Sequence, residues 1–142
     1  MSKIVIGREY PDVVTDLVKN AQQSIKILIY DWRWYSDEVG SRIQKFNNEI
    51  VRASRRGVDV SVLVNSDFIG NPLAEQKIKV RKINSSRVMH VKMLIFDDKY
   101  LVLGSHNLTK NAFELNHEIS VLLEDVESIN KCRQFFNQIC PL

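Results

Sequence analysis

Cysteine and histidine are scarce in this chain, which has two cysteines and three histidines among its 142 residues. Cys132 and Cys140 are eight positions apart on an expected helix. They would be about 12 Å apart along its axis, whereas a disulfide needs Cα atoms within about 7 Å. Neither cysteine has a histidine at an interval that suits a shared metal ion. The sequence therefore predicts reduced thiols, no metal site and no cofactor.

Long apolar runs and a strong excess of one charge are also missing. No apolar segment approaches the ~20 residues that a membrane span needs. The 20 Lys and Arg residues against 17 Asp and Glu leave a formal charge of only +3. Arg8 and Glu9 are charged where a secretory signal would have its apolar segment. We therefore expect one domain over residues 1–142, located in the cytoplasm and without membrane contact.

Apolar residues recur alternately at strand spacing and at helix spacing along the chain. A helix is expected over Asp37–Arg56, with Val39 on its apolar face, and a strand with one apolar and one basic face over Lys77–Ile83. Further strands are expected at 3–6, 24–30, 58–64, around 90–96, at 100–103 and at 117–123, and further helices at 11–21 and 125–139. This alternation predicts an α/β fold in which a mixed β-sheet is sandwiched between helices.

The stretch Val88–Asn107 contains the densest set of residue types used in catalysis. His90 and Lys92 are two apart in a β-prone run, so they are expected on one face of a strand, about 6.6 Å apart. Ser105 and Asn107 are again two apart, where a second strand ends, and can point together. Two groups at this spacing can share one phosphate.

The same stretch carries a family motif. Its fixed positions, in the pattern H-x-K-x4-D-x6-G-S-x-N, are His90, Lys92, Asp97, Gly104, Ser105 and Asn107. The chain thus resembles the phospholipase D superfamily, and within it the small dimeric bacterial Nuc-type endonucleases. The segments I-K-I-L-I-Y, R-R-G-V-D-V and N-H-E extend the resemblance over nearly the whole chain. The resemblance implies an α-β-α sandwich and cleavage of phosphodiesters through a covalent phosphohistidine.

Cleaving a phosphodiester without a metal needs a nucleophile, groups that neutralise the phosphate oxygens, and an acid for the leaving oxygen. His90 is the candidate nucleophile or acid. The candidate phosphate-binding residues are Lys92, Ser105 and Asn107. A lysine on a buried strand is costly without an anionic partner, and a bound phosphate would supply one.

Two carboxylates complete the candidate catalytic set. Asp97 lies seven residues beyond His90, an odd interval that points it to the other face of a regular strand, so it is expected to support the turn at residues 97–99. Glu118, by the resemblance, is expected to accept a hydrogen bond from Nδ1 of His90 and to leave Nε2 free to attack. The alternative for Glu118 is a solvated charge on a strand.

The motif occurs once and supplies one His90. Cleavage through a phosphohistidine takes place in two displacements and needs both a nucleophile and an acid. His106 and His117 are the other histidines, but each alternates away from the motif residue beside it. A homodimer with a two-fold axis through the site would bring two copies of His90 together, as the resemblance implies. We therefore expect a homodimer that shares its active site.

The candidate substrate-binding residues indicate nucleic acid, with DNA ahead of RNA. Five basic residues precede the motif, namely Lys77, Lys79, Arg81, Lys82 and Arg87, and they could follow a phosphate backbone. Trp32 and Trp34 could stack bases, although packing at an interface is an equal alternative. The expected function is an endonuclease. A cardiolipin-type lipid phosphodiesterase and a non-catalytic nucleic-acid-binding module are the alternatives.

Overall fold

The computed structural model describes residues 2–65, 69–83 and 85–140. Within them, one sheet has the strand order β1-β7-β6-β5-β2-β3-β4, in which β2, β3 and β4 run parallel and the other neighbours are antiparallel. The strands are β1 (Ser2–Ile6), β2 (Ser24–Ile29), β3 (Asp59–Val64), β4 (Lys79–Lys82), β5 (Lys92–Phe96), β6 (Tyr100–Gly104) and β7 (Ile119–Leu123). The helices are a 3-10 turn (Gly7–Glu9), α1 (Tyr10–Asn20), α2 (Arg42–Arg55), α3 (Gly70–Ala74), α4 (Lys110–Glu114) and α5 (Val126–Ile139).

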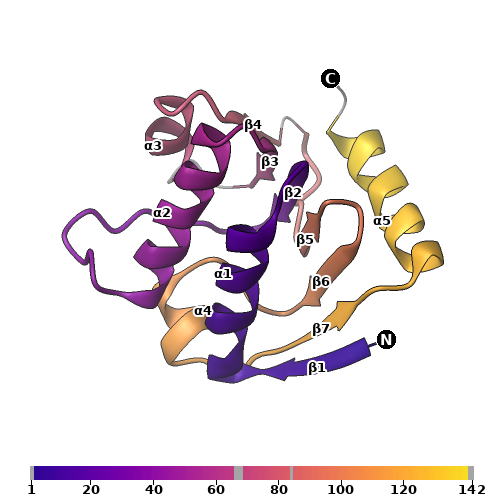
Figure 1. Ribbon diagram of the computed structural model, residues 1–142, viewed down its shortest axis with the longest axis horizontal. Coiled ribbons are helices and arrows are strands. Elements are labelled where there is room, and N and C mark those ends of the chain that lie inside the picture. The colour runs from indigo at the N-terminus through magenta and orange to yellow at the C-terminus, as the bar shows by residue number, and fades with distance from the viewer. Residues whose placement is uncertain (1, 66–68, 84, 141–142) are drawn as a thin grey trace.

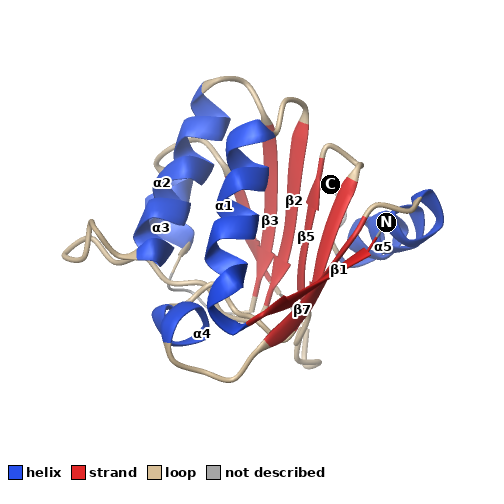
Figure 2. Cartoon of the chain, turned by 60° about the horizontal axis from the view of Figure 1, so that its bottom comes forward, coloured by secondary structure: helices blue, strands red, loops and turns tan. Residues whose placement is uncertain are grey.

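The sheet is covered on both faces (Figure 1, Figure 2): α1 and α2 lie on one side and α5 on the other. Strand β2 has buried residues toward both layers, because Ile25, Ile27 and Ile29 pack on the side of α1 and α2 while Leu28 packs toward α5. Each such side chain contributes about 1.5–3 kcal/mol when fully buried. The expected mixed sheet between helices is confirmed. No helix in the described ranges combines the length and apolarity that crossing a bilayer requires.

The pairing register places one set of strand ends at a common edge of the sheet. Ile29 at the end of β2 pairs with Lys92 at the start of β5, and Gly104 at the end of β6 pairs with Ser120 near the start of β7. The polar segments that follow β2 and β6 and precede β5 and β7 therefore meet at this edge. Phe96, at the other end of β5, pairs with Ile25 at the opposite edge.

Several expected boundaries were wrong. Strands β5 and β7 begin at Lys92 and Ile119, two residues later than expected. Helix α2 begins at Arg42 because the Ser41 hydroxyl accepts a hydrogen bond from the N–H of Gln44 and caps the helix there. Val39 consequently lies outside the helix and is 66% exposed. Strand β4 begins only at Lys79, because Lys77 has a φ of 63°, which belongs to a turn and not to a strand.

Candidate active site

His90 and Lys92 lie side by side at the edge where the strand ends meet. Nζ of Lys92 is 3.0 Å from Nδ1 of His90. The ring of Tyr30, which follows β2, is 4.6 Å from the His90 ring between centroids and 5.5 Å from Nζ of Lys92. The N–H of Met89 donates to Oδ1 of Asn65 and fixes the segment that carries His90. The proximity expected for His90 and Lys92 is therefore observed.

This contact selects the tautomer of a neutral His90 ring. A charged ammonium can only donate, so Nδ1 is the acceptor and a neutral ring carries its proton on Nε2. If Nε2 were the nucleophile it would have to be unprotonated, and the Lys92 ammonium would then have to leave Nδ1 before attack. A phosphate anion would attract the ammonium in that direction.

Lys92 is half-buried, and its surroundings act on its charge. Burial lowers the pKa of Lys92 from its ordinary value, while the carboxylate of Glu118 acts in the opposite direction. A second anion, such as a bound phosphate, would favour the ammonium further. The position therefore suits a lysine whose charged form is stabilised further when an anionic substrate binds.

The side chain of Asn107 is held in one orientation. Its Oδ1 accepts a hydrogen bond of 3.1 Å from the N–H of Asp31. The segments after β2 and β6 pair here, because the N–H of Leu108 donates to the carbonyl of Asp31 and the N–H of Arg33 donates to the carbonyl of Leu108. Nδ2 of Asn107 has no acceptor in the described part of the chain, so it is available to donate to a substrate oxygen.

Ser105 is held by Glu118. Its hydroxyl donates to Oε1 of Glu118 at 2.6 Å and accepts from the N–H of Ile119 at 3.0 Å. Nδ2 of Asn116 donates to the other carboxylate oxygen at 3.1 Å. Because a serine hydroxyl has one proton, Ser105 cannot donate to a phosphate while it donates to Glu118. Its geometry is that of a residue that positions Glu118, which differs from the expected phosphate contact.

The expected hydrogen bond between Glu118 and Nδ1 of His90 is not formed within the chain. Glu118 precedes β7 and His90 precedes β5, and β6 lies between these strands in the sheet. Two strand spacings amount to about 9.6 Å. Ser105 follows β6, which is the neighbour of β7, and therefore reaches Glu118 first.

Glycine at position 104 is required by the close approach of β7. A Cβ atom there would lie 2.3 Å from Oγ of Ser120, 2.4 Å from its Cα and 2.5 Å from the carbonyl oxygen of Ile119. Such contacts are too short for a side chain, and two of the three atoms belong to the backbone. The glycine of the motif therefore allows β6 and β7 to meet beside Ser105.

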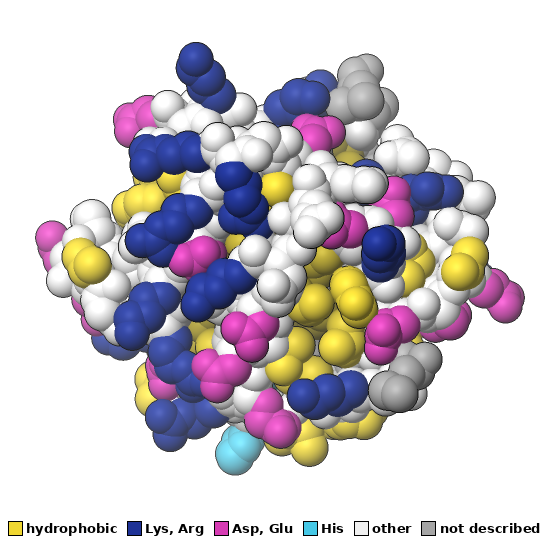
Figure 3. Space-filling view, in the orientation of Figure 1, with side chains coloured by type: hydrophobic (Ala, Val, Ile, Leu, Met, Phe, Trp, Pro, Cys, Tyr) yellow, Lys and Arg dark blue, Asp and Glu magenta, His cyan; other side chains and the backbone are white. Residues whose placement is uncertain are grey.

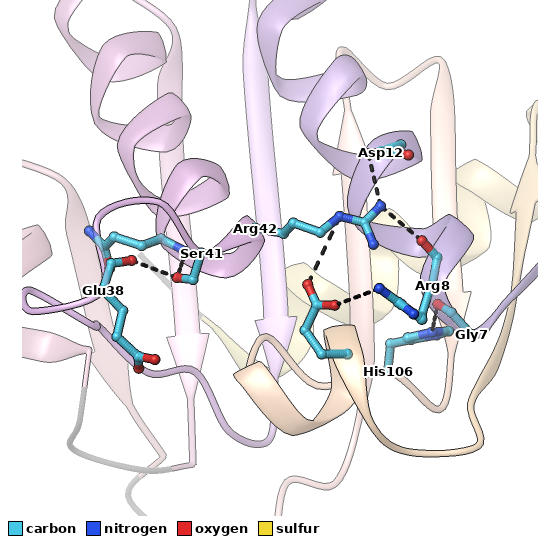
Figure 4. A network of polar contacts seen from close by, with 9 residues as sticks. Gly7, Arg8, Asp12, Glu38, Ser41, Arg42 and His106 are labelled. Atoms are coloured by element: carbon cyan, nitrogen blue, oxygen red, sulfur yellow. Dashed lines mark hydrogen bonds and ion pairs between the residues drawn. The ribbon is translucent and has the colours of Figure 1, made fainter.

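His106 is a core residue. It is fully buried, stacks on Tyr10 at 4.0 Å between centroids, and has Nε2 2.9 Å from the carbonyl of Gly7 (Figure 4) and Nδ1 2.8 Å from Oγ of Ser120. A carbonyl only accepts, so Nε2 carries the proton and Nδ1 accepts from the serine. Burial lowers the pKa of His106 below its ordinary value, and the opposite effects of the Gly7 carbonyl and Glu118 are smaller. His106 therefore cannot donate a proton to a leaving oxygen. His117, in contrast, is exposed.

The interpretation of Trp32 as a base-stacking residue was wrong. Trp32 is fully buried, and its Nε1 donates to Oδ1 of Asn47 at 2.6 Å. Backbone hydrogen bonds to the segment after β6 hold this residue in the core, between the sheet and α2. Trp34 is half-buried and packs against the same core.

Asp97 has a structural environment far from His90. Its carboxylate accepts hydrogen bonds from the N–H groups of Gln22, Gln23 and Ser24, at 2.7–3.1 Å, where β2 begins. Burial alone would raise the pKa of Asp97. Hydrogen bonds from these three N–H groups and the charge of Lys99 together lower it below the ordinary value. Asp97 supports the fold, as expected, but its carboxylate holds the start of β2 and not the turn at residues 97–99.

We expect Asp97→Asn to lower the free energy of unfolding by roughly 2 kcal/mol at neutral pH, because hydrogen bonds to a charged acceptor are removed. A depressed pKa in the folded state contributes stability above the unfolded value of about 3.9, and this contribution disappears as pH falls through the folded pKa. The difference from wild type should therefore shrink below about pH 4. Urea unfolding at several pH values measures it.

Asp98→Asn is the matched control, since Asp98 has a φ of 52°, close to the 56° of Asp97. Among the described residues, its carboxylate contacts only Lys26 and Arg133, in surface ion pairs. We expect a decrease of under about 1 kcal/mol. Equal decreases in the two variants would contradict the role assigned to Asp97.

A groove of about 600 Å³ extends from His90 along the side of α5. Of the expected basic residues, Arg81, Lys82 and Arg87 line it. Lys77 and Lys79 do not, and Lys79 forms an ion pair with Asp59 at the opposite end of β3. A second gathering of Lys and Arg lies over α1 and α2 (Figure 3), where it is interleaved with acidic side chains, namely Asp12, Asp16 and Glu49.

Sequence position did not identify Tyr30 as a site residue. It also did not show that Arg87 lies in a groove. Tyr30 ends an apolar run and is indistinguishable there from a core residue. A polar or aromatic residue just after a buried strand that pairs with the motif strand is the signal that could have identified it.

A histidine and a lysine lie together at one edge of the sheet, and an asparagine follows the neighbouring strand there. None of the described residues that line the adjoining groove is acidic. Side chains of these types could bind the oxygens of a phosphate ester. A family model described as "Cardiolipin synthase, PLD-like domain" matches residues 14–140. The chain therefore belongs to the phospholipase D superfamily, which is a superfamily of phosphodiesterases.

Several known proteins are similar to it. Nuc, a phospholipase D family member from Salmonella typhimurium, has a TM-score of 0.81 at 20% identity, and NucT from Helicobacter pylori has a TM-score of 0.77 at 20% identity. In both cases 98% of this chain and 94% of the other are covered, which establishes the shared fold. The mitochondrial cardiolipin hydrolase of Mus musculus is 27% identical over 125 residues, which are 84% of this chain and 52% of that protein. The chain thus spans about half the length of this curated relative.

Proposed function

We propose that residues 1–142 act as one phospholipase D-like domain and that the chain is a metal-independent endonuclease. The observation that carries the proposal is the pairing of His90 and Lys92, with Nζ of Lys92 3.0 Å from the histidine ring, beside Tyr30, whose chain neighbour Asp31 orients the amide of Asn107. A nucleophile, a cation and a fixed donor at one point can bind and attack a phosphodiester.

The charges beside the site favour nucleic acid as substrate. Arg81 and Arg87 line the groove next to His90, and no described lining residue is acidic. A nucleic acid has a negative charge at every nucleotide and so matches several cations in a row. The name of the mouse relative supports a lipid substrate instead, so a cardiolipin-type phosphodiesterase is the second candidate.

We propose that the active site is shared across a homodimer. Within the described ranges, His90 is the histidine that contacts Lys92 and Tyr30, whereas His106 is buried under Tyr10 and hydrogen-bonded to Gly7. His117 is exposed beside Glu118. A second copy related by a two-fold axis would supply the missing acid as its own His90.

The proposed reaction has two displacement steps. Nε2 of one His90 forms a bond to phosphorus while the phosphorus–oxygen bond to the leaving group breaks, and the imidazolium of the other His90 gives its proton to that oxygen. Water then attacks the phosphohistidine, the second ring takes the proton of the water, and the nitrogen–phosphorus bond breaks. Lys92 and Asn107 stabilise the charge on the phosphate oxygens throughout.

The test is to incubate the purified protein with labelled DNA, RNA and cardiolipin vesicles in EDTA, beside a His90→Ala variant. We expect cleavage of nucleic acid that persists in chelator and disappears in the variant. Cleavage of cardiolipin alone would support the second candidate, and binding without cleavage would support a non-catalytic module. Activity that disappears in EDTA and is restored by magnesium or zinc would contradict metal independence.

The groove also predicts which basic residues bind the backbone. In the His90→Ala background, we expect Arg81→Ala with Arg87→Ala to reduce the slope of log affinity against log salt by about 0.7–0.9 for each phosphate that these arginines neutralise. The paired variant Lys77→Ala with Lys79→Ala removes the same charge away from the groove and should change the slope much less. Equal changes in the two double variants would mean that only net charge matters.

A further inference from the structure

The groove beside His90 has an apolar floor and a basic wall. Its floor includes Leu63, Met89 and Ile139, which belong to β3, the segment before β5 and α5. Arg81 and Arg87 supply the cations. A volume within the range of about 300–1,000 Å³ accommodates a ligand of the size of a nucleotide. The groove therefore offers an apolar surface directly beside the reacting phosphate.

Two apolar side chains in this groove are exposed to solvent. Val88 is 66% exposed and Phe135, on α5, is 40% exposed. Exposed apolar groups that adjoin each other and are rimmed by polar groups mark binding surfaces. An aromatic ring next to cations is the combination that holds single-stranded nucleic acid, because every base has a face that can stack.

We infer that this groove holds an unstacked base next to the scissile phosphate, with Phe135 and Val88 against the base and Arg81 and Arg87 against the flanking phosphates. The inference rests on the proposed nuclease function and adds to it a substrate class, single-stranded nucleic acid. A duplex would have to open before its base could enter.

The shape and the charges favour a base over a lipid acyl chain. An acyl chain gains most in an enclosed pocket without charges, whereas this groove is open and carries Arg81 and Arg87 along its length. A single strand places its base and the two neighbouring phosphates at separate points, which matches an apolar floor beside a basic wall.

The experiment uses the His90→Ala chain, which is expected to bind without cleaving. Its affinity is measured for a short single-stranded DNA and for a strand of the same length in which every base is replaced by an abasic site, so that the phosphate charge is equal. We expect the strand with bases to bind about tenfold more tightly. Phe135→Ala and Val88→Ser should each reduce this ratio toward one.

Val126→Ser is the matched control, because Val126 is 72% exposed, lies at the start of α5 and does not line the groove. It should keep the wild-type ratio, and thermal melts should show that all variants fold. A ratio near one in the parent chain, or a ratio that Phe135→Ala leaves unchanged, would overturn the inference. If Phe135→Ala lost binding to cardiolipin vesicles but kept its binding to DNA, the inference would also be overturned. That result would identify an acyl chain as the occupant. Failure of the wild-type chain to cleave any nucleic acid is a separate result, which overturns the nuclease proposal itself.

Discussion

A heterodimer of one wild-type chain and one His90→Ala chain is expected to lose about 10²- to 10⁴-fold of wild-type turnover, because it has a nucleophile or an acid but not both. Each composite site needs two chemically identical rings in different protonation states, so removing one copy disables the only site. Wild-type activity should fall at both low and high pH, because the site needs one protonated and one unprotonated ring. Co-expression with two different tags allows the heterodimer to be isolated and assayed.

A heterodimer of wild-type and His117→Ala chains is the control, since His117 is exposed and stands beside Glu118. It should keep nearly full activity. A His90 heterodimer with half of wild-type turnover, or a fully active monomer, would mean that each chain has a complete site. His117 would then be the acid to test, because His106 is buried.

Replacing Lys92 by methionine should lower kcat by about 10²- to 10³-fold, as expected for the removal of one group that stabilises developing charge. Methionine keeps much of the apolar stem of lysine, so the fold beside Tyr30 should persist. The removal of the charge should also free Nδ1 of His90, which lies 3.0 Å from Nζ in the substrate-free chain. Steady-state kinetics at several pH values measure the effect.

Lys99→Met provides the comparison, because Lys99 is exposed in the turn between β5 and β6 at the opposite edge of the sheet. It removes the same charge and should leave kcat within about twofold, as a distant screened charge does. A decrease in kcat that is equal in the two variants would show that Lys92 acts only through net charge. An unchanged kcat with a raised KM would show that it binds substrate and transition state equally.

Sequence periodicity predicted the local features well, because they depend on neighbouring residues. The apolar run of β2 indicated a buried strand, and the interval of two indicated that His90 and Lys92 lie together, although β5 begins at Lys92 and His90 precedes it. Boundaries were less certain where one hydrogen bond decides them, as at Ser41, or where a positive φ interrupts a strand, as at Lys77.

The sequence by itself determined the family, the mixed sheet between helices, and the proximity of His90 and Lys92. Only the tertiary structure decided their partners. The strand order places β6 between β5 and β7, so Glu118 meets Ser105 and not His90. It also buries Trp32 against Asn47 and carries Asp97 to the start of β2. These outcomes depend on which distant strands become neighbours, and this is set by packing of the whole chain, which spacing along the sequence does not encode.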